Sequence, residues 1–174
     1  LYEAFVALQK GPEFAAPEPA QRRIVDILVR DAVLSGVGLE GEAKQRFGAI
    51  LTELAELQTT FSNHVLDATK AYALLLRDRD EVAGLPESAL ALAAQSAREA
   101  GEASATAEQG PWRITLDAPS LVPALEHLAR RDLRERLYRA HVTRASSGET
   151  DNAVLIPRIL ALRAEEARLL GFES

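Results

Sequence analysis

The longest regular pattern of apolar positions begins at Phe47 and advances in steps of three and four residues. This spacing places apolar side chains along one face of an α-helix, and it predicts a helix over residues 40–70. Such a helix is stable in water only when another element covers its apolar face. We expect the preceding helix, predicted over residues 20–34, to fold back along it through a glycine-containing turn. The stripe consists of Phe47, Ile50, Leu54, Leu57, Phe61, Val65 and Ala68.

Shorter patterns predict helical segments on both sides of this spine helix. Residues 1–10 form a short amphipathic stretch, and a link containing glycine and proline follows over residues 11–19. Pro86 precedes an alanine-rich segment, and because proline is favoured where helices begin, a helix is predicted over residues 87–100. In the last third of the chain, Ser120, Asp132 and Asp151 carry side-chain oxygens that can cap helices. They predict helices over residues 120–129, 133–144 and 151–170, with a loop over residues 145–150.

One segment has the pattern of a β-strand. Residues 112–116 alternate apolar and polar side chains between two prolines, which predicts an extended conformation. A single strand is not stable alone, so it needs a partner. The best candidate is residues 72–77, a segment that otherwise prolongs the spine helix. We therefore expect a small antiparallel ribbon, with a mobile loop over residues 101–110 because that segment is small and polar.

Composition supports a mostly helical protein. Apolar residues make up 47% of the chain but aromatic residues only 5%, and alanine and leucine dominate. Residues of this kind lose little side-chain freedom in a helix. We predict an all-α (mostly α) fold: an antiparallel helical bundle with a long spine helix and a small two-stranded antiparallel β ribbon.

The net charge of −6 argues against a nucleic-acid partner, which normally requires a basic stripe. No apolar run approaches the length of about 20 residues that crosses a bilayer, so we expect no membrane partner. The lack of a basic and apolar leader favours the cytoplasm. The chain begins at Leu1 and contains no methionine, from which we expect a piece of a longer protein.

A cluster of arginines is interleaved with Asp132 and Glu135. Opposite charges at this spacing predict a solvated helix face with local ion pairs, which we favour over a phosphate-binding patch. The cluster consists of Arg130, Arg131, Arg134, Arg136 and Arg139.

No residues form a complete catalytic or metal-binding motif. His64, His127 and His141 lie far apart, and none has a second histidine four residues along, as the zinc-binding His-Glu-x-x-His helix requires. The chain has no cysteine, nucleophile elbow or phosphate-binding loop. Residues 78–81 are acidic but lack the spacing of a calcium loop, and they predict an exposed turn. We therefore predict no catalytic and no metal-binding residue here, and the sequence identifies no substrate-binding residue.

An ordered set of strings is more specific than any of these motifs. The set resembles, in order, the region before the catalytic domain of the oligopeptidase A group, within the thimet oligopeptidase family of zinc metallopeptidases. The resemblance covers about residues 21–172. The strings are residues 30–39, 61–69, 83–90, 115–120, 137–140, 143–146, 159–163 and 169–172.

The resemblance implies an almost entirely helical fold in which two halves flank a deep, narrow channel. It implies that residues 1–174 are the N-terminal helical domain fragment of a larger oligopeptidase, with the catalytic domain absent from the chain. Zinc is then the cofactor of the parent enzyme, with none bound by this fragment. The implied partners are short peptides and the fragment's own catalytic domain.

Two departures limit what the resemblance carries over. Leu121 stands where the family usually has an aromatic residue, and the loop over residues 146–150 looks shorter than in relatives. No catalytic or zinc-binding residue of the family maps onto this chain.

The leading hypothesis is that the parent is a cytoplasmic zinc endopeptidase, in which a glutamate deprotonates zinc-bound water. This inactive fragment would supply one wall of the substrate channel. The alternative is a free-standing helical scaffold or protein-interaction module without enzymatic activity. A His-Glu-x-x-His motif downstream in the gene would separate the two.

Overall fold

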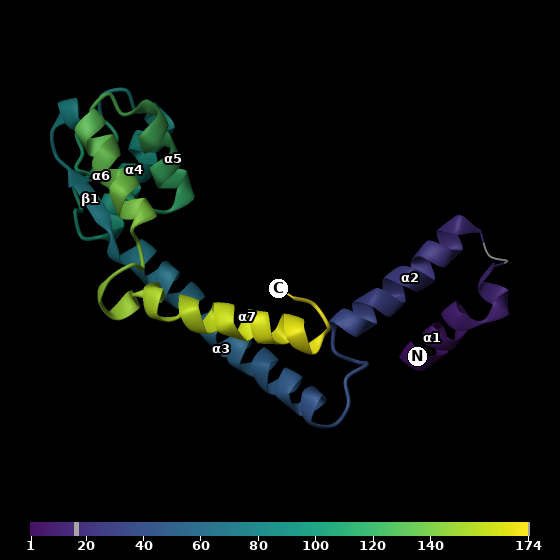
Figure 1. Cartoon of the computed structure of the whole chain (residues 1–174). Coiled ribbons are helices and arrows are strands. Elements are labelled where there is room, and N and C mark those ends of the chain that lie inside the picture. Colours follow the sequence, from purple (N-terminus) through teal and green to yellow (C-terminus); the bar gives the residue numbers. More distant parts are fainter. Residues whose placement is uncertain (16–17, 174) are drawn as a thin grey trace. The chain divides into compact units, whose positions relative to one another are not determined.

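The computed structural model describes residues 1–15 and 18–173, and it is mostly helical (Figure 1). The mostly α fold, the long spine helix and the two-stranded ribbon are confirmed. Two residues of the predicted link, 16 and 17, lie outside the described residues. The α-helices are α1 (Tyr2–Lys10), α2 (Pro19–Leu34), α3 (Gly41–Ala71), α4 (Glu87–Glu99), α5 (Ala118–His127), α6 (Arg131–Val142) and α7 (Ile156–Leu169), and the strands are β1 (Ala73–Leu76) and β2 (Trp112–Thr115).

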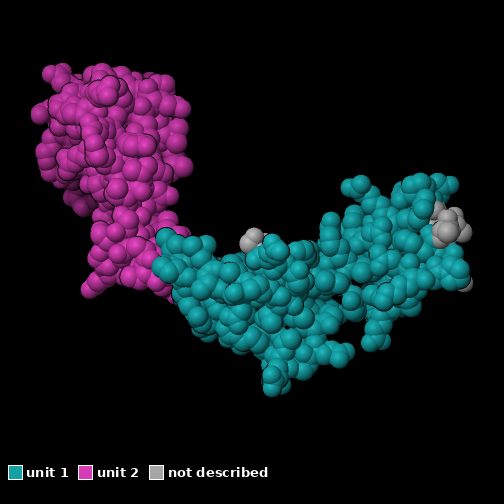
Figure 2. Space-filling view, viewed as in Figure 1, with its two compact units in different colours: residues 1–58, 156–174 teal, residues 59–155 magenta. Residues whose placement is uncertain are grey.

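The chain divides into two compact units (Figure 2). Unit 1 contains residues 1–58 and 156–174, and unit 2 contains residues 59–155. The spine helix α3 begins in unit 1 and ends in unit 2.

The core of unit 1 is small and lies between α3 and α7. Ile50 and Leu54 of α3 are buried against Leu162 of α7, and Leu57 and Ile159 pack around them. The prediction that the helix over residues 20–34 covers α3 is therefore wrong, since α7 does so. The stripe shows that α3 needs an apolar partner, but it does not say which helix provides one. The apolar face of α7 is as suitable as that of the helix over residues 20–34.

Two ion pairs join the same helices on the surface of unit 1. Arg46 donates to both carboxylate oxygens of Glu165 at 2.6 Å, and Arg158 donates to those of Glu53 at 2.5 and 2.6 Å. Arg46 and Glu53 lie two turns apart on α3, and their partners lie two turns apart on α7 in the opposite direction. The pairs therefore fix an antiparallel arrangement and its register.

We expect unit 1 to lose stability in acid. Hydrogen bonds from Arg158 and Arg46 lower the pKa values of Glu53 and Glu165. A carboxylate whose pKa is lower when folded stabilises the fold above its unfolded pKa of about 4.3, and this contribution is lost as the pH falls through the folded value. Urea unfolding of Glu53→Gln/Glu165→Gln, followed by circular dichroism, should therefore depend less on pH below about 5 than the parent chain does. The exposed control Glu108→Gln should keep the parent's pH dependence, and equal slopes for all three proteins would contradict the expectation.

The core of unit 2 surrounds the ribbon, whose prediction is confirmed. The strands pair antiparallel, with Leu74 opposite Ile114 and Leu76 opposite Trp112. All four side chains are buried, because helices cover the ribbon. The core consists of the ribbon, Ala93, Ala94 and Ala97 of α4, Leu121 and Ala124 of α5, and Leu133 and Leu137 of α6, with neighbouring loop residues.

The loop between β1 and α4 meets the end of α5 at very close range. The Ala129 amide donates to the Ala83 carbonyl at 2.8 Å. Next to it, Gly84 has a φ of +93°, and a Cβ there would lie 2.1 Å from the His127 carbonyl oxygen. Only glycine fits this backbone conformation in this space.

Helix α4 follows Pro86, as predicted, whereas Ser120 and Asp132 do not cap α5 and α6, and Asp151 caps a short 3₁₀ helix in place of α7. Ser120 lies inside α5 and its Oγ accepts a hydrogen bond from the Thr115 amide at 3.0 Å. Asp132 lies in the first turn of α6 and pairs with Arg130 at 2.5 Å. Asp151 accepts from the Ala153 amide of a short 3₁₀ helix, Asn152–Val154, and α7 begins only at Ile156. For Ser120 and Asp132, another donor bonds to the side-chain oxygen.

The segment over residues 101–110 is a loop, as predicted, but several contacts hold it. Thr106 and Gly110 form an isolated β-bridge, and Ala105 is buried. The Arg98 guanidinium donates to the Ala105 carbonyl at 2.6 Å. The mobility of this loop stays a prediction.

Candidate interaction surfaces

The three histidines lie on three separate helices, α3, α5 and α6. His64 makes a structural contact: its Nδ1 lies 2.9 Å from Oδ1 of Asn152, whose Nδ2 donates to the Phe61 carbonyl at 3.1 Å. With the amide in this orientation, Oδ1 accepts and Nδ1 of His64 must donate. Asn152 is only 4% exposed, so these bonds anchor the segment before α7 to the spine helix within unit 2.

The other two histidines do not approach a shared site. His127 is exposed at the end of α5, whereas His141 is partly buried on α6. Burial, with a smaller effect of Arg144, lowers the pKa of His141. Over residues 1–15 and 18–173, no group of three or more histidine, aspartate or glutamate side chains is arranged to hold a metal ion. The absence of bound zinc stays a prediction for experiment.

The arginine cluster is a solvated helix face with local ion pairs, as predicted. Arg139 pairs with Glu135 at 2.8 Å, and the hydrogen bond from Arg130 lowers the pKa of Asp132. Arg134 instead donates to the Ala129 carbonyl at the end of α5.

The acidic residues 78–81 form an exposed turn, as predicted. The Glu81 carboxylate accepts hydrogen bonds from the Arg77 and Asp78 amides at 2.9 and 3.1 Å. These bonds lower the pKa of Glu81. The carboxylate therefore stabilises the turn.

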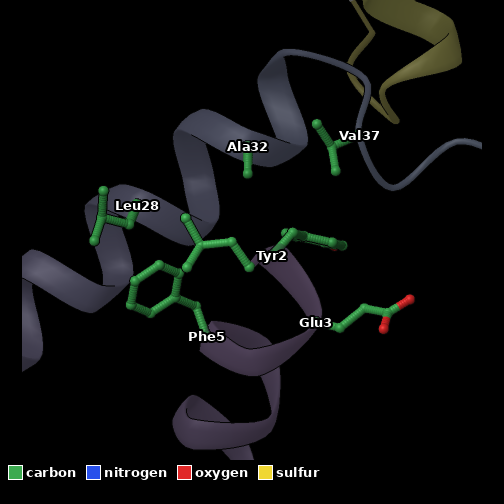
Figure 3. Close-up of a pocket in the computed structure, with 7 residues that line it drawn as sticks. Tyr2, Glu3, Phe5, Leu28, Ala32 and Val37 are labelled. Atoms are coloured by element: carbon green, nitrogen blue, oxygen red, sulfur yellow. The ribbon is translucent and has the colours of Figure 1, made fainter.

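A pocket of about 520 Å³, lined mainly by apolar side chains, lies between α1 and α2 in unit 1. Figure 3 shows Leu28 and Ala32 directed from α2 toward Tyr2 and Phe5 of α1, with Val37 beside them. None of the side chains described in either helix is fully buried, although both helices are amphipathic. Each helix therefore covers the other only in part.

A second apolar pocket of unit 1, of about 400 Å³, lies where α2 and α7 end. Leu34, Leu170 and Phe172 line it, and Leu34 and Phe172 are exposed. Large exposed apolar patches are typical of interaction sites. We call the following residues the apolar surface of unit 1: Tyr2, Phe5, Leu28, Ala32, Leu34, Val37, Leu170 and Phe172.

The sequence analysis placed Leu28, Ala32 and Leu34 in a helix but expected the apolar face of that helix to cover the spine helix. The amphipathic pattern of residues 1–10 was the available signal for a second apolar face. No helix in the described part of the chain has the length and apolar character needed to cross a membrane.

Comparison with known proteins agrees with the sequence resemblance. Residues 1–44 match the family described as the neurolysin/thimet oligopeptidase N-terminal domain. The whole chain is 47% identical to a probable cytosolic oligopeptidase A of Arabidopsis thaliana, and it aligns with 25% of that protein. It is 45% identical to oligopeptidase A of Escherichia coli, again over 25% of that protein. A dipeptidyl carboxypeptidase of Escherichia coli is 34% identical over 86% of this chain and 21% of its own length. The chain thus spans about a quarter of the length of the curated relatives it matches.

Proposed function

We propose that this chain, an oligopeptidase A N-terminal region by its sequence, is the noncatalytic helical part of a zinc-dependent peptidase that hydrolyses short peptides. The observation that carries the proposal is the similarity of the whole chain to oligopeptidase A proteins. The chain is 45–47% identical to them and aligns with one quarter of their length. In the parent, zinc would supply an activated water for peptide hydrolysis. The residues of this chain would take part through shape and packing.

The role we propose for these helices is one wall of the substrate channel. A wall built from packed helices has a fixed shape, because a close-packed core resists deformation. A narrow channel admits short extended peptides and excludes folded proteins on steric grounds. This part of the protein would therefore select substrates by size.

We further propose that the apolar surface of unit 1 binds the remaining three quarters of the parent polypeptide, which includes the catalytic domain. Burial of exposed leucine, valine and phenylalanine side chains would stabilise the association by about 25 cal/mol per Å² of apolar surface removed from water. The partial burial of the apolar faces of α1 and α2 supports this proposal, since contact with another part of the parent would complete their burial.

The site of cleavage within a peptide would be set outside this chain. Relatives named oligopeptidase A and relatives named dipeptidyl carboxypeptidase share this region. We propose the cytoplasm as the location. The sequence identity favours no compartment, since a cytosolic and an organellar relative are both 47% identical to the chain.

The proposal is tested by expressing this chain and the rest of the parent polypeptide separately and mixing them. We expect the two parts to form a complex on gel filtration and to cleave a quenched fluorescent peptide at least about tenfold faster than the catalytic part alone. Leu28→Asp, in the α1–α2 pocket, should weaken the association by about 10- to 100-fold, because burial of a leucine contributes about 1.5–3 kcal/mol.

The matched control is Val122→Asp, which adds the same charge at an exposed apolar residue of unit 2. It should bind like the parent sequence. If the two parts do not associate, and no His-Glu-x-x-His motif follows in the gene, the chain is a free-standing helical scaffold or interaction module.

We expect the chain alone to be inert as a peptidase and to retain no stoichiometric zinc. Zinc-dependent hydrolysis at neutral pH needs a metal with several protein ligands and a carboxylate that takes a proton from water. His64, His127 and His141 lie on three different helices, and His64 is already bonded to Asn152. The measurement is bound metal after incubation with zinc and desalting, together with cleavage of a fluorescent peptide. One zinc per chain, or cleavage lost in His64→Ala, would contradict the expectation.

A further inference from the structure

A polar groove of about 270 Å³ follows one edge of the ribbon in unit 2. Ser96 and Glu99 of α4, Arg113 of β2 and Asp117, the residue before α5, are among the residues that line it. The core of unit 2 does not fill this groove, since Glu99 and Asp117 are both exposed.

Two hydrogen bonds establish which backbone groups of the ribbon point outward. In an antiparallel pair, every second residue directs its N–H and C=O away from the partner strand. The Thr115 amide donates to Oγ of Ser120, and the Arg77 amide donates to Oε2 of Glu81, so neither is used between the strands. Leu75 and Arg113 lie opposite each other, two residues before Arg77 and Thr115 respectively. Their backbone groups therefore also point outward, one pair on each edge of the ribbon.

The outer edge of β2 is open at Arg113. Its backbone N–H and C=O make no hydrogen bond on this edge to any part of the chain that the structure describes. Its side chain is held instead, because Nη1 donates to Oγ of Ser96 at 3.0 Å. Arg113 therefore presents one unpaired backbone N–H and one unpaired backbone C=O on this edge of β2.

We infer that this edge of β2 binds an extended peptide segment that carries a basic side chain. An unpaired strand edge binds extended peptides through main-chain hydrogen bonds, and neighbouring side chains provide the selectivity. One peptide residue exchanges two hydrogen bonds with Arg113, as residues do within an antiparallel ladder. Glu99 accepts a hydrogen bond from the Gln95 side-chain amide through Oε1 only, and Asp117 accepts one from the Thr115 hydroxyl through Oδ2 only. Each carboxylate keeps its second oxygen for a ligand, and two carboxylates against one guanidinium favour a lysine or arginine on the peptide.

The site is built from unit 2 alone and does not rest on the proposed function.

The test uses the 174-residue chain labelled with ¹⁵N and the probe acetyl-Thr-Val-Lys-Val-Thr-amide at millimolar concentration. We expect the peptide to slow hydrogen exchange of the Arg113 amide several-fold. The Leu75 amide should not change, and it serves as an internal control because it points outward from the opposite edge. The same peptide N-methylated at every residue should not bind, since it has no backbone donor.

Glu99→Lys should weaken binding of the probe about three- to five-fold, as expected for a partly exposed charge pair. Glu108→Lys makes the same change of charge at an exposed loop residue outside the groove and should have no effect. Protection of Leu75 in place of Arg113, equal binding of the N-methylated peptide, or no response to the probe would overturn the inference. None of these results bears on association with the catalytic part, so the two proposals fail separately.

Discussion

Gly84→Ala is expected to destabilise unit 2 by about 3–5 kcal/mol, because the new methyl group meets backbone strain and a clash together. At a φ of +93° an alanine is strained by about 1–3 kcal/mol. Its Cβ would also lie 2.1 Å from the His127 carbonyl oxygen, so α5 has to move. That movement stretches the hydrogen bond from the Ala129 amide to the Ala83 carbonyl, which joins the two segments.

Gly101→Ala is the matched control for this effect. Gly101 has a φ of +103°, and a Cβ there has no atom within 4 Å among the described residues. This variant therefore measures the backbone strain without the clash. We expect urea unfolding to give a clearly smaller loss for Gly101→Ala than for Gly84→Ala. Equal losses would mean that the close approach of α5 contributes nothing.

The sequence predicted which segments form helices and strands better than it predicted which of these elements pack against each other. The stripe from Phe47 specified the spine helix, because a period of three and four residues has one structural interpretation. It did not specify the covering helix, because any apolar face satisfies the requirement, and α7 rather than α2 provides it. The ribbon was predicted correctly for a different reason: a lone strand needs a partner, and residues 72–77 were the best candidate to pair with residues 112–116.

The helix caps show where local inference failed. Ser120 and Asp132 are suitable capping residues by type, but each bonds to a donor that the sequence pattern does not reveal. Asp151 does cap, but the helix that it caps is a short 3₁₀ helix before α7. The groove beside Arg113 was missed for a related reason. Which backbone groups of a ribbon point outward depends on its register, and alternation of side chains does not determine that register for two short strands.

The test proposed for the groove requires a folded unit 2, so its central residue must be identified. Trp112 is the largest fully buried side chain and is 1% exposed. Its ring lies against Gly110, where a Cβ would be 2.6 Å from the indole, and its Nε1 donates to the Ala107 carbonyl at 3.1 Å. The guanidinium of Arg79 lies 5.7 Å from the ring centre. One side chain thus joins β2 to the 101–110 loop and to the turn after β1.

Trp112→Ala is therefore expected to destabilise unit 2 by about 3–5 kcal/mol, the range for removal of a buried aromatic side chain. Trp112→Phe keeps most of the buried ring but leaves the Ala107 carbonyl without its donor, so we expect a loss of about 1–3 kcal/mol. Tyr138→Ala, at an aromatic residue 56% exposed on α6, should change stability by less than about 0.5 kcal/mol. Urea unfolding of the three variants checks the order. A loss for Trp112→Ala no greater than that for Tyr138→Ala would show that the ring does not hold the ribbon, the loop and the turn together.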